Sequence, residues 1–370
     1  MTTAVQAPSW LPDVRITLAQ LASGILEYAE GFTGGTSFRL PYPANLQLAL
    51  DRLTLLAWHQ SVPPPGSVVE LLQLAHTPFA EWSLVLTDAD VDPEESLLAY
   101  GRPTVTCEEL GKLRGDVEAE LRENALMHGV LDKSQAHDAP ESYVAFRKLL
   151  ISRPAITAFD LDARLADPHL ALLAEEVRQA YADAPPEAIA DGIVRTCEGC
   201  HGLRLPLDDD RTWACVDDSC PDPSRAGPNH RAADGVQWLR RELRTFIAGP
   251  GRAELRIAEA VSELGVSARL WPDFDAYDLS AFDQKPWVAD IKAWRSPTRL
   301  ARRLRQGLFA IPDDADRAFI VIAREQVRAH PRYLDRLQRA CPAVGRGQRI
   351  VAVSEDQFLS AVSRRAEAAR

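Results

Sequence analysis

Two aspartates and a lysine in the C-terminal half have the types and spacing of a hydrolytic metal site. Asp290 and Lys292 are two residues apart within 287–294, so both side chains leave the same face if this segment is a strand. Asp278 precedes them in the segment 271–283. Two carboxylates beside an ammonium group can bind a hard divalent cation through oxygen ligands and hold a lysine near the attacking water. The pattern therefore predicts metal-assisted hydrolysis.

A β-hairpin would bring these side chains together. Residues 271–294 read as two short strands with a turn around residues 284–285. If the turn centres there, antiparallel pairing sets Asp278 opposite about Ile291, which makes Asp290 its neighbour across the ladder. The two carboxylates and the nearby ammonium group then converge at one point on the sheet.

A fourth acidic group comes from the preceding helix. Residues 251–265 have a helical pattern that ends in a glycine, which is typical of helix C-termini. Glu254 shares a face with Ala258 and Val261, so it points toward the sheet among apolar neighbours, whereas Glu259 lies on a wetter face. Glu254 is therefore the better candidate.

The order of these elements resembles the PD-(D/E)xK superfamily of restriction-endonuclease-like nucleases. The resemblance covers about residues 251–325, with a helix that carries a glutamate, a strand at 266–270, a strand with an aspartate and a strand with Asp-x-Lys. It implies that the carboxylates bind magnesium and that the lysine assists a water in cutting a phosphodiester. Carried over residue by residue, the magnesium ligands are Glu254, Asp278 and Asp290, and the fourth catalytic residue is Lys292.

Two other aspartates compete with Asp278 for its place. Pro272-Asp273 matches the literal Pro-Asp of the superfamily, and Asp275 is also near. We prefer Asp278 because its register meets Asp290, and because a buried-strand pattern follows it at Leu279, Ala281 and Phe282.

Basic residues follow the Asp-x-Lys strand at once. The helix expected at 297–306 carries Arg299, Arg302 and Arg303, and its start places it beside the site. We expect these three arginines to contact phosphates, for which guanidinium groups are well suited. An α/β core is completed by strands expected at 319–323 and 349–353 and by helices expected at 331–340 and 355–368.

Four cysteines upstream form a second motif. Cys197 and Cys200 make one close pair, and after fourteen residues Cys215 and Cys220 make another. Two such pairs are typical of a tetrahedral structural zinc site, here in a zinc ribbon with strands near 203–207 and 211–214. Disulfides are the alternative, and they are disfavoured in a chain that shows no export signal.

Composition separates the chain into an acidic and a basic part. The formal net charge is −11, but the residues from 225 onward hold 26 Lys and Arg against 18 Asp and Glu. This part carries +8 and residues 1–224 carry −19, so the C-terminal part suits a polyanionic partner such as DNA. No apolar run is long enough to span a bilayer and the N-terminus lacks the pattern of a signal peptide, so we expect a cytoplasmic protein.

The N-terminal half reads as mainly helical. Apolar residues recur at helical spacing in 18–29, 44–58 and 67–75, and further helices are expected at 107–127, 141–151 and 161–181. An amphipathic helix is also expected at 238–247. We therefore predict a multidomain chain with an all-α helical adaptor or docking domain at 1–190, a four-cysteine zinc ribbon and linker at 191–228, and an α/β restriction-endonuclease-like domain at 229–370.

The whole arrangement has a closer resemblance. The helical half, the four-cysteine ribbon, Tyr277-Asp278-Leu279 and the Asp-x-Lys segment 287–294 are together similar to the restriction-endonuclease-like protein that accompanies bacterial PIWI-related Argonaute homologues in pPIWI-RE systems. The resemblance implies a DNA-directed nuclease, recruited by partner proteins, from a three-gene island that includes a DinG-type helicase and acts against invading nucleic acid. Whether its substrate is duplex, single-stranded, in an R-loop or RNA stays open.

These observations predict a metal-dependent DNA endonuclease of a prokaryotic defence system. It would use Mg²⁺ or Mn²⁺ in catalysis and Zn²⁺ in the ribbon, and it would act with a PIWI/Argonaute-like protein and a helicase. The alternative is a catalytically inactive nuclease fold that serves as a nucleic-acid-binding or adaptor subunit.

Overall fold

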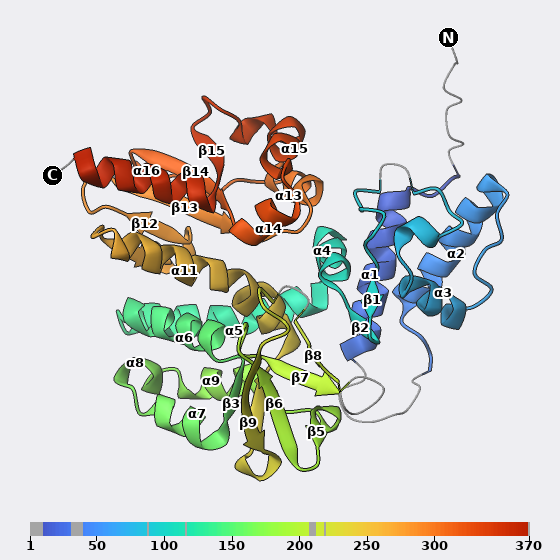
Figure 1. The fold of residues 1–370 in the computed structure, drawn as a ribbon, viewed down its shortest axis with the longest axis horizontal. Helices are drawn as coiled ribbons and strands as arrows, with labels where there is room; N and C mark the ends of the chain where they lie inside the picture. The colour runs from blue at the N-terminus through green and yellow to red at the C-terminus, as the bar shows by residue number, and fades with distance from the viewer. Residues whose placement is uncertain are drawn as a thin grey trace. The chain divides into compact units, whose positions relative to one another are not determined.

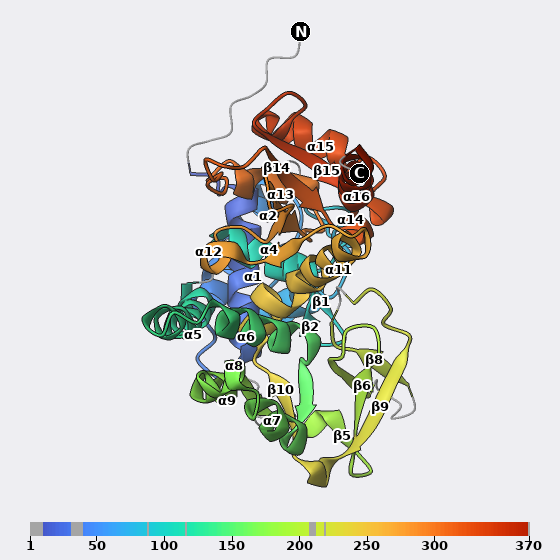
Figure 2. The same cartoon turned by 90° about the vertical axis from the view of Figure 1, so that its left-hand side faces the viewer.

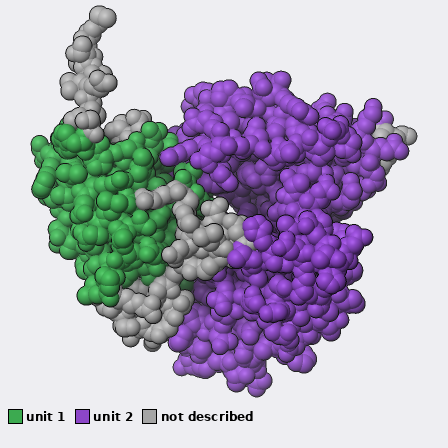
Figure 3. Space-filling model, turned by 180° about the vertical axis from the view of Figure 1, so that it is seen from behind, with its two compact units in different colours: residues 1–116 green, residues 117–370 purple. Residues whose placement is uncertain are grey.

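The chain forms two compact units in the computed structural model. The structure describes residues 10–30, 40–86, 89–114, 117–206, 212–217 and 220–368, and the two units are residues 1–116 and 117–370 (Figure 3). The division therefore falls inside the range predicted as one helical domain, 1–190. The domain boundaries predicted at 190 and 228 stay predictions. Among the described residues, no helix is both long and apolar enough to cross a membrane.

The first unit is built from helices around one apolar core. The three helices predicted at its start are confirmed, and the Ser67 hydroxyl caps the third by accepting a hydrogen bond from the Glu70 N–H at 3.2 Å. Two very short strands, β1 (Leu98–Ala99) and β2 (Arg102–Pro103), interrupt the all-α pattern. The helices are α1 (Val14–Glu30), α2 (Ala44–Gln60), α3 (Val68–Ala75) and α4 (Val105–Arg114), with the turn η1 (Phe79–Glu81).

The second unit begins with a helical layer. It contains α5 (Val117–Ala136), α6 (Pro140–Ser152), α7 (Ala158–Leu165), α8 (Pro168–Ala171) and α9 (Ala174–Ala180). The described residues of the helix predicted at 107–127 belong to α4 and α5, and the long helix predicted at 161–181 is divided. In the second of these, Asp167 caps a new helix by accepting from the His169 N–H at 2.9 Å, because Pro168 starts a helix more readily than it continues one.

A small antiparallel sheet lies against this layer and corrects a prediction. Its strand order is β3 (Ala155–Thr157), β10 (Val236–Leu239) and β4 (Tyr181–Asp183). Trp238 pairs with Ala155 on one side and Ala182 on the other, so the helix predicted at 238–247 begins later. It consists of α10 (Arg241–Leu243) and a π-helical turn, η4 (Arg244–Ala248).

The cysteine-rich segment folds as a small antiparallel sheet, as a ribbon requires. Figure 2 shows its strands to the right of α7 and α9. The strand order is β5 (Ile189–Ala190), β6 (Ile193–Cys197), β7 (Leu203–Pro206) and β8 (Trp213–Cys215), with β9 (Ala226–Arg231) paired to β6. Residues 207–211 of the predicted ribbon strands lie outside the described residues. The turns η2 (Pro186–Ala188) and η3 (Ala232–Asp234) flank the sheet.

The C-terminal part is a five-stranded mixed sheet, which confirms the predicted α/β core. The order is β11 (Ala268–Leu270), β12 (Leu279–Ala281), β13 (Trp287–Lys292), β14 (Arg317–Ile322) and β15 (Ile350–Ser354). The first two pairings are antiparallel and the last two are parallel. Between β11 and β12 lies a short irregular turn, α12 (Pro272–Asp275).

Helices cover both faces of this sheet (Figure 1). Apolar side chains of α11 (Gly249–Glu263) and α16 (Glu355–Ala368) pack on one face, and those of α13 (Pro297–Leu304) and α15 (Tyr333–Ala340) pack on the other. The short helix α14 (Arg324–Ala329) precedes α15. The helix predicted at 331–340 is therefore matched by α15 alone.

Helix α6 of the helical layer lies beside α11 of the C-terminal part (Figures 1 and 2). The two helices approach closely at Gly251, since a Cβ at this position would collide with the Ile151 side chain. The helical layer is thus packed directly on the helix that carries Glu254.

Candidate active site and four-cysteine cluster

The hairpin β12–β13 sets the positions of both predicted aspartates. Its register pairs Leu279 with Ala289, which places Asp278 opposite Asp290. The Asp278 N–H extends the ladder by donating to the Ala289 carbonyl at 3.1 Å. The predicted pairing set Asp278 opposite Ile291. The observed pairing is shifted by one residue, because the turn is centred at residue 284 and not between residues 284 and 285. Directly opposed residues share a face of the sheet, so the two carboxylates lie on the same side.

The hairpin also fixes the carboxylates by hydrogen bonds. Asp278 is buried, and its Oδ2 accepts from the Ile291 N–H at 2.5 Å. Lys292 Nζ donates to Asp290 Oδ1 at 2.5 Å, as expected for side chains that leave the same face of one strand. A charge-assisted bond of this length holds the ammonium beside the Asp290 carboxylate.

Helix α11 supplies the third carboxylate. Glu254 is buried together with Ala258 and Val261, whereas Glu259 is exposed, so the predicted face of the helix is the one that turns inward. The Trp271 indole N–H donates to Glu254 Oε2 at 2.6 Å. A buried carboxylate needs such partners because it loses its hydration.

Arg147, on α6, completes the cluster and was missed by the sequence reasoning. Its guanidinium donates to Glu254 Oε2 at 3.2 Å and to Asp275 Oδ2, and it lies 4.6 Å from the centre of the Trp271 ring. Only 3% of Arg147 is exposed. One signal was present, because Arg147 lies at helical spacing from the apolar residues Tyr143 and Leu150 and therefore on the inner face of α6.

The cluster carries an excess of buried negative charge. Burial raises the pKa of Asp278 well above its ordinary value, and the charges of Glu254 and Asp290 raise it further. Burial likewise raises the pKa of Glu254, and the charge of Arg147 opposes this. Burial lowers the pKa of Lys292, but the charges of Asp290 and Asp278 outweigh it, so the pKa is raised and Lys292 is a cation at neutral pH.

The donor set fits a hard divalent cation in its chemistry. Carboxylate oxygens are the ligands that Mg²⁺ prefers, and a cation would relieve the repulsion that raises the pKa of Asp278. In the described part of the chain, however, the one group of three or more acidic, His or Cys side chains arranged around a common point is the four-cysteine cluster. The carboxylates of Glu254, Asp278 and Asp290 would have to turn toward a shared ion.

The three arginines predicted to contact phosphates lie in different surroundings. Arg303 is exposed and donates to Gln306 at 3.1 Å, and Arg302 is half-buried. Arg299 is 0% exposed, because it lies on the face of α13 that Leu300 and Leu304 turn to the sheet. Arg299 is therefore withdrawn from the predicted phosphate contacts.

The four cysteines of the ribbon come together as predicted. Their Sγ atoms all lie within 4.8 Å of one another, with 3.6 Å between Cys197 and Cys220 and 3.4 Å between Cys200 and Cys215. All four are free thiols in the structure. Hydrogen bonds from Cys200 and Cys215 lower the pKa of Cys220 to about 5, and the hydrogen bonds with Cys200 and Cys220 raise the pKa of Cys215. This group could hold a metal ion.

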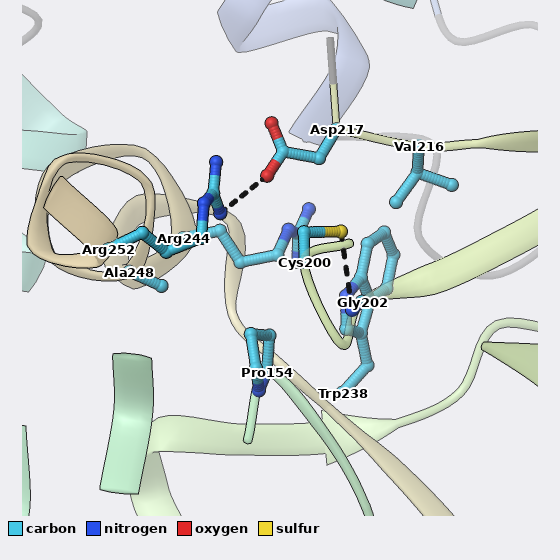
Figure 4. Close-up of a pocket in the computed structure, with 9 residues that line it drawn as sticks. All are labelled: Pro154, Cys200, Gly202, Val216, Asp217, Trp238, Arg244, Ala248 and Arg252. Atoms are coloured by element: carbon cyan, nitrogen blue, oxygen red, sulfur yellow. Dashed lines mark hydrogen bonds and ion pairs between the residues drawn. The ribbon is translucent and has the colours of Figure 1, made fainter. Parts of the chain in front are cut away.

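The ribbon contacts the helix of the candidate active site (Figure 4). Asp217, between the last two cysteines, pairs with Arg252 near the start of α11 at 2.7 Å. Beside this pair, the Arg244 guanidinium lies 3.5 Å from the centre of the Trp238 ring. These residues line a small pocket next to Cys200. The cysteine cluster and Glu254 are thus linked through one helix.

A mixed α/β sheet with opposed aspartates, an Asp-x-Lys strand and a buried glutamate on the preceding helix defines a restriction-endonuclease-like domain. The comparison with family models gives the particular family. Residues 251–370 match the REase associating with pPIWI_RE, and residues 17–157 match the pPIWI_RE three-gene island domain Y. The two segments belong to these families, which confirms the predicted resemblance. No curated protein and no solved structure gave a significant match to the chain.

Proposed function

We propose that this chain is a metal-dependent DNA endonuclease of a prokaryotic defence system. The observation that carries the proposal is the meeting of Asp278, Asp290 and Lys292 on one hairpin, with Glu254 on the adjoining helix, inside the segment that matches an REase. Two carboxylates with a cationic lysine can hydrolyse a phosphodiester with the help of a divalent cation.

Each residue would have a separate role in the reaction. Glu254, Asp278 and Asp290 would hold Mg²⁺ or Mn²⁺, which when bound supplies charge stabilisation at the phosphate and a more acidic water. Lys292 stays protonated beside Asp290, so its Nζ–H groups would donate to the attacking water or to a phosphate oxygen. Asp278 is already held in place by the Ile291 N–H.

The DNA backbone would run past helix α13. Arg302 and Arg303 are the arginines of the predicted set that remain available to phosphates there. The net charge of +8 from residue 225 onward supports a polyanionic substrate. Binding of this kind weakens as salt rises.

The cysteine cluster would bind structural Zn²⁺. Zinc–sulfur bonds of about 2.3 Å give sulfur–sulfur distances of about 3.8 Å in a tetrahedron, close to the 3.4 and 3.6 Å found between the cysteine pairs. The tight turn of the first pair supports the assignment. Gly199 lies so close to the Cys220 sulfur and the Asp222 carbonyl that a Cβ would be 2.9 and 2.6 Å away.

The partners follow from the family. The matched models are described as associating with pPIWI_RE and as part of its three-gene island. We therefore propose that the chain acts with a PIWI/Argonaute-like protein and a DinG-type helicase, on DNA that these partners open or guide.

The test is cleavage of plasmid and R-loop DNA by the full chain with Mg²⁺ or Mn²⁺, alone and with both partners. Asp290→Ala and Lys292→Ala should each reduce cutting at least about 100-fold while the circular dichroism spectrum is unchanged. Normal cutting by both variants would contradict the site. DNA binding that persists in EDTA, together with no cutting in Mg²⁺ or Mn²⁺ even with the partners present, would favour the inactive binding subunit.

A further inference from the structure

The candidate active site contains a second fixed cation besides Lys292. Four carboxylates influence one another electrostatically here: those of Glu254 and Asp278 are buried, that of Asp290 is half-buried and that of Asp275 is exposed. Two cations, Arg147 and Lys292, lie among them.

Arg147 and Lys292 contact different carboxylates. Lys292 holds Asp290, and Arg147 bridges Glu254 and Asp275 with separate guanidinium nitrogens. The aromatic face of Trp271 lies against the guanidinium of Arg147. The indole N–H of the same residue donates to Glu254. The position of the Arg147 charge is therefore fixed on two sides.

The polar contacts of the Arg147 guanidinium are those with Glu254 and Asp275. Its Nε is buried and has no hydrogen-bond partner among the described residues. Removing a charged side chain from water is costly unless opposite charges surround it, as they do here.

We propose that Arg147 takes the place of a second metal ion, so that the nuclease site binds a single divalent cation. This inference rests on the proposed function. The Glu254 oxygen that accepts from Arg147 and Trp271 is Oε2, which leaves Oε1 to turn toward an ion shared with Asp278 and Asp290. An ion at Asp275 and Glu254 Oε2 would instead have to displace the guanidinium.

Arg147 lies outside the segment that matches the REase. Arg147 belongs to residues 17–157, which match domain Y, whereas Glu254 and Asp275 belong to residues 251–370, which match the REase. Both matched segments thus contribute side chains to one site. The close packing of α6 on α11 at Gly251 and Ile151 holds them in this arrangement.

The test counts Mn²⁺ ions bound to the zinc-loaded full chain, from the electron paramagnetic resonance signal of free Mn²⁺. Asp290→Asn identifies the ions that belong to the site, because other acidic groups bind equally in all variants. We expect the natural chain to bind one such ion and Arg147→Met to bind two. Lys148→Met, a change of the neighbouring exposed cation on the same helix, should bind one.

The outcomes separate this inference from the proposed function. Two site ions in the natural chain, or one in a folded Arg147→Met variant, would overturn the single-ion site. If Arg147→Met does not fold, the count in the natural chain decides. If Asp290→Asn removes no Mn²⁺, the proposed nuclease site is itself wrong and this inference falls with it.

Discussion

At the scale of single residues, Glu254 shows how a buried carboxylate is held in a chosen direction. Its Oε2 accepts from the Trp271 indole at 2.6 Å and from Arg147 at 3.2 Å. Burial opposes its ionisation and Arg147 favours it. The orientation of Glu254 therefore depends on two side chains outside the Asp-x-Lys hairpin.

Replacing Trp271 by Phe removes the shorter of these bonds. We expect Trp271→Phe to lower the free energy of unfolding by about 1–3 kcal/mol, since a buried charged group loses a hydrogen bond. Urea denaturation of the full chain measures the change. Trp238→Phe is the control, because the Trp238 N–H has no hydrogen-bond partner among the described residues. Equal losses in both variants would show that only ring packing matters.

The site residues that the sequence predicted are those whose positions follow from local periodicity. Asp290 and Lys292 share a strand, and Glu254 lies on the apolar stripe of α11. Arg147 escaped because 128 residues separate it from its partner Asp275 and no local pattern relates the two. The arginines at 299, 302 and 303 predicted one basic face of α13. Arg299 lies instead on the apolar face of this helix.

At the scale of elements, a charged network ties three helices of the nuclease-like part together. Arg256 on α11 pairs with Glu355 on α16 at 2.7 Å and with Glu325 on α14 at 2.8 Å. Glu355 also accepts from the Arg324 N–H at 3.0 Å. This network lies on the helix that carries Glu254, so it steadies one wall of the site.

The network makes a pH-dependent contribution to stability. Burial alone would raise the pKa of Glu355, but its bonds with Arg256 and the Arg324 N–H outweigh burial, and the pKa is lowered from 4.5. A group whose pKa is lower in the folded state stabilises the protein above its unfolded pKa. That contribution is lost as pH falls through the folded value.

Glu355→Gln should therefore destabilise the chain by about 1–3 kcal/mol at pH 7 and by progressively less below about pH 4.5. Thermal unfolding followed by circular dichroism across this range measures the difference. Glu367→Gln changes an exposed carboxylate on the same helix and should have little effect at either pH. A penalty that stays constant or grows on acidification would contradict the assignment.

Some element boundaries can be predicted from the local sequence pattern alone. The terminal helix predicted at 355–368 coincides with α16, because a long amphipathic pattern follows a clear strand. Trp238 instead entered a strand, because pairing with Ala155 and Ala182 on both sides overrode its helical spacing. Such pairing joins residues that are 83 and 56 positions apart in sequence, which periodicity cannot detect.

At the scale of the whole molecule, the second compact unit joins the helical layer, the ribbon and the nuclease-like sheet. Trp271 belongs to the apolar core of the helical layer and also touches Glu254. Asp217 of the ribbon forms an ion pair with Arg252 on α11, the helix that also carries Glu254. The order of the parts was predictable from their motifs, whereas these contacts depend on tertiary packing.

Removal of zinc should affect more than the ribbon. We expect about one zinc per chain by elemental analysis, and a melting temperature of the 117–370 unit at least about 5 °C lower after chelation, because folding and metal binding are coupled. Cys215→Ser should reproduce the loss, and chelation of that variant should add nothing. An unchanged melting curve for the zinc-free chain would contradict a structural metal.

The central claim is that the carboxylates bind the cation while Lys292 acts in catalysis, and one paired measurement tests it directly. Mn²⁺ binding and DNA cutting are measured on the same full chain, with its partners, for Asp290→Asn and Lys292→Met. Asp290→Asn should lose both, whereas Lys292→Met should keep Mn²⁺ binding and lose cutting at least about 100-fold. Undiminished cutting by Lys292→Met, or Mn²⁺ binding and cutting that survive in Asp290→Asn, would contradict this account of the site.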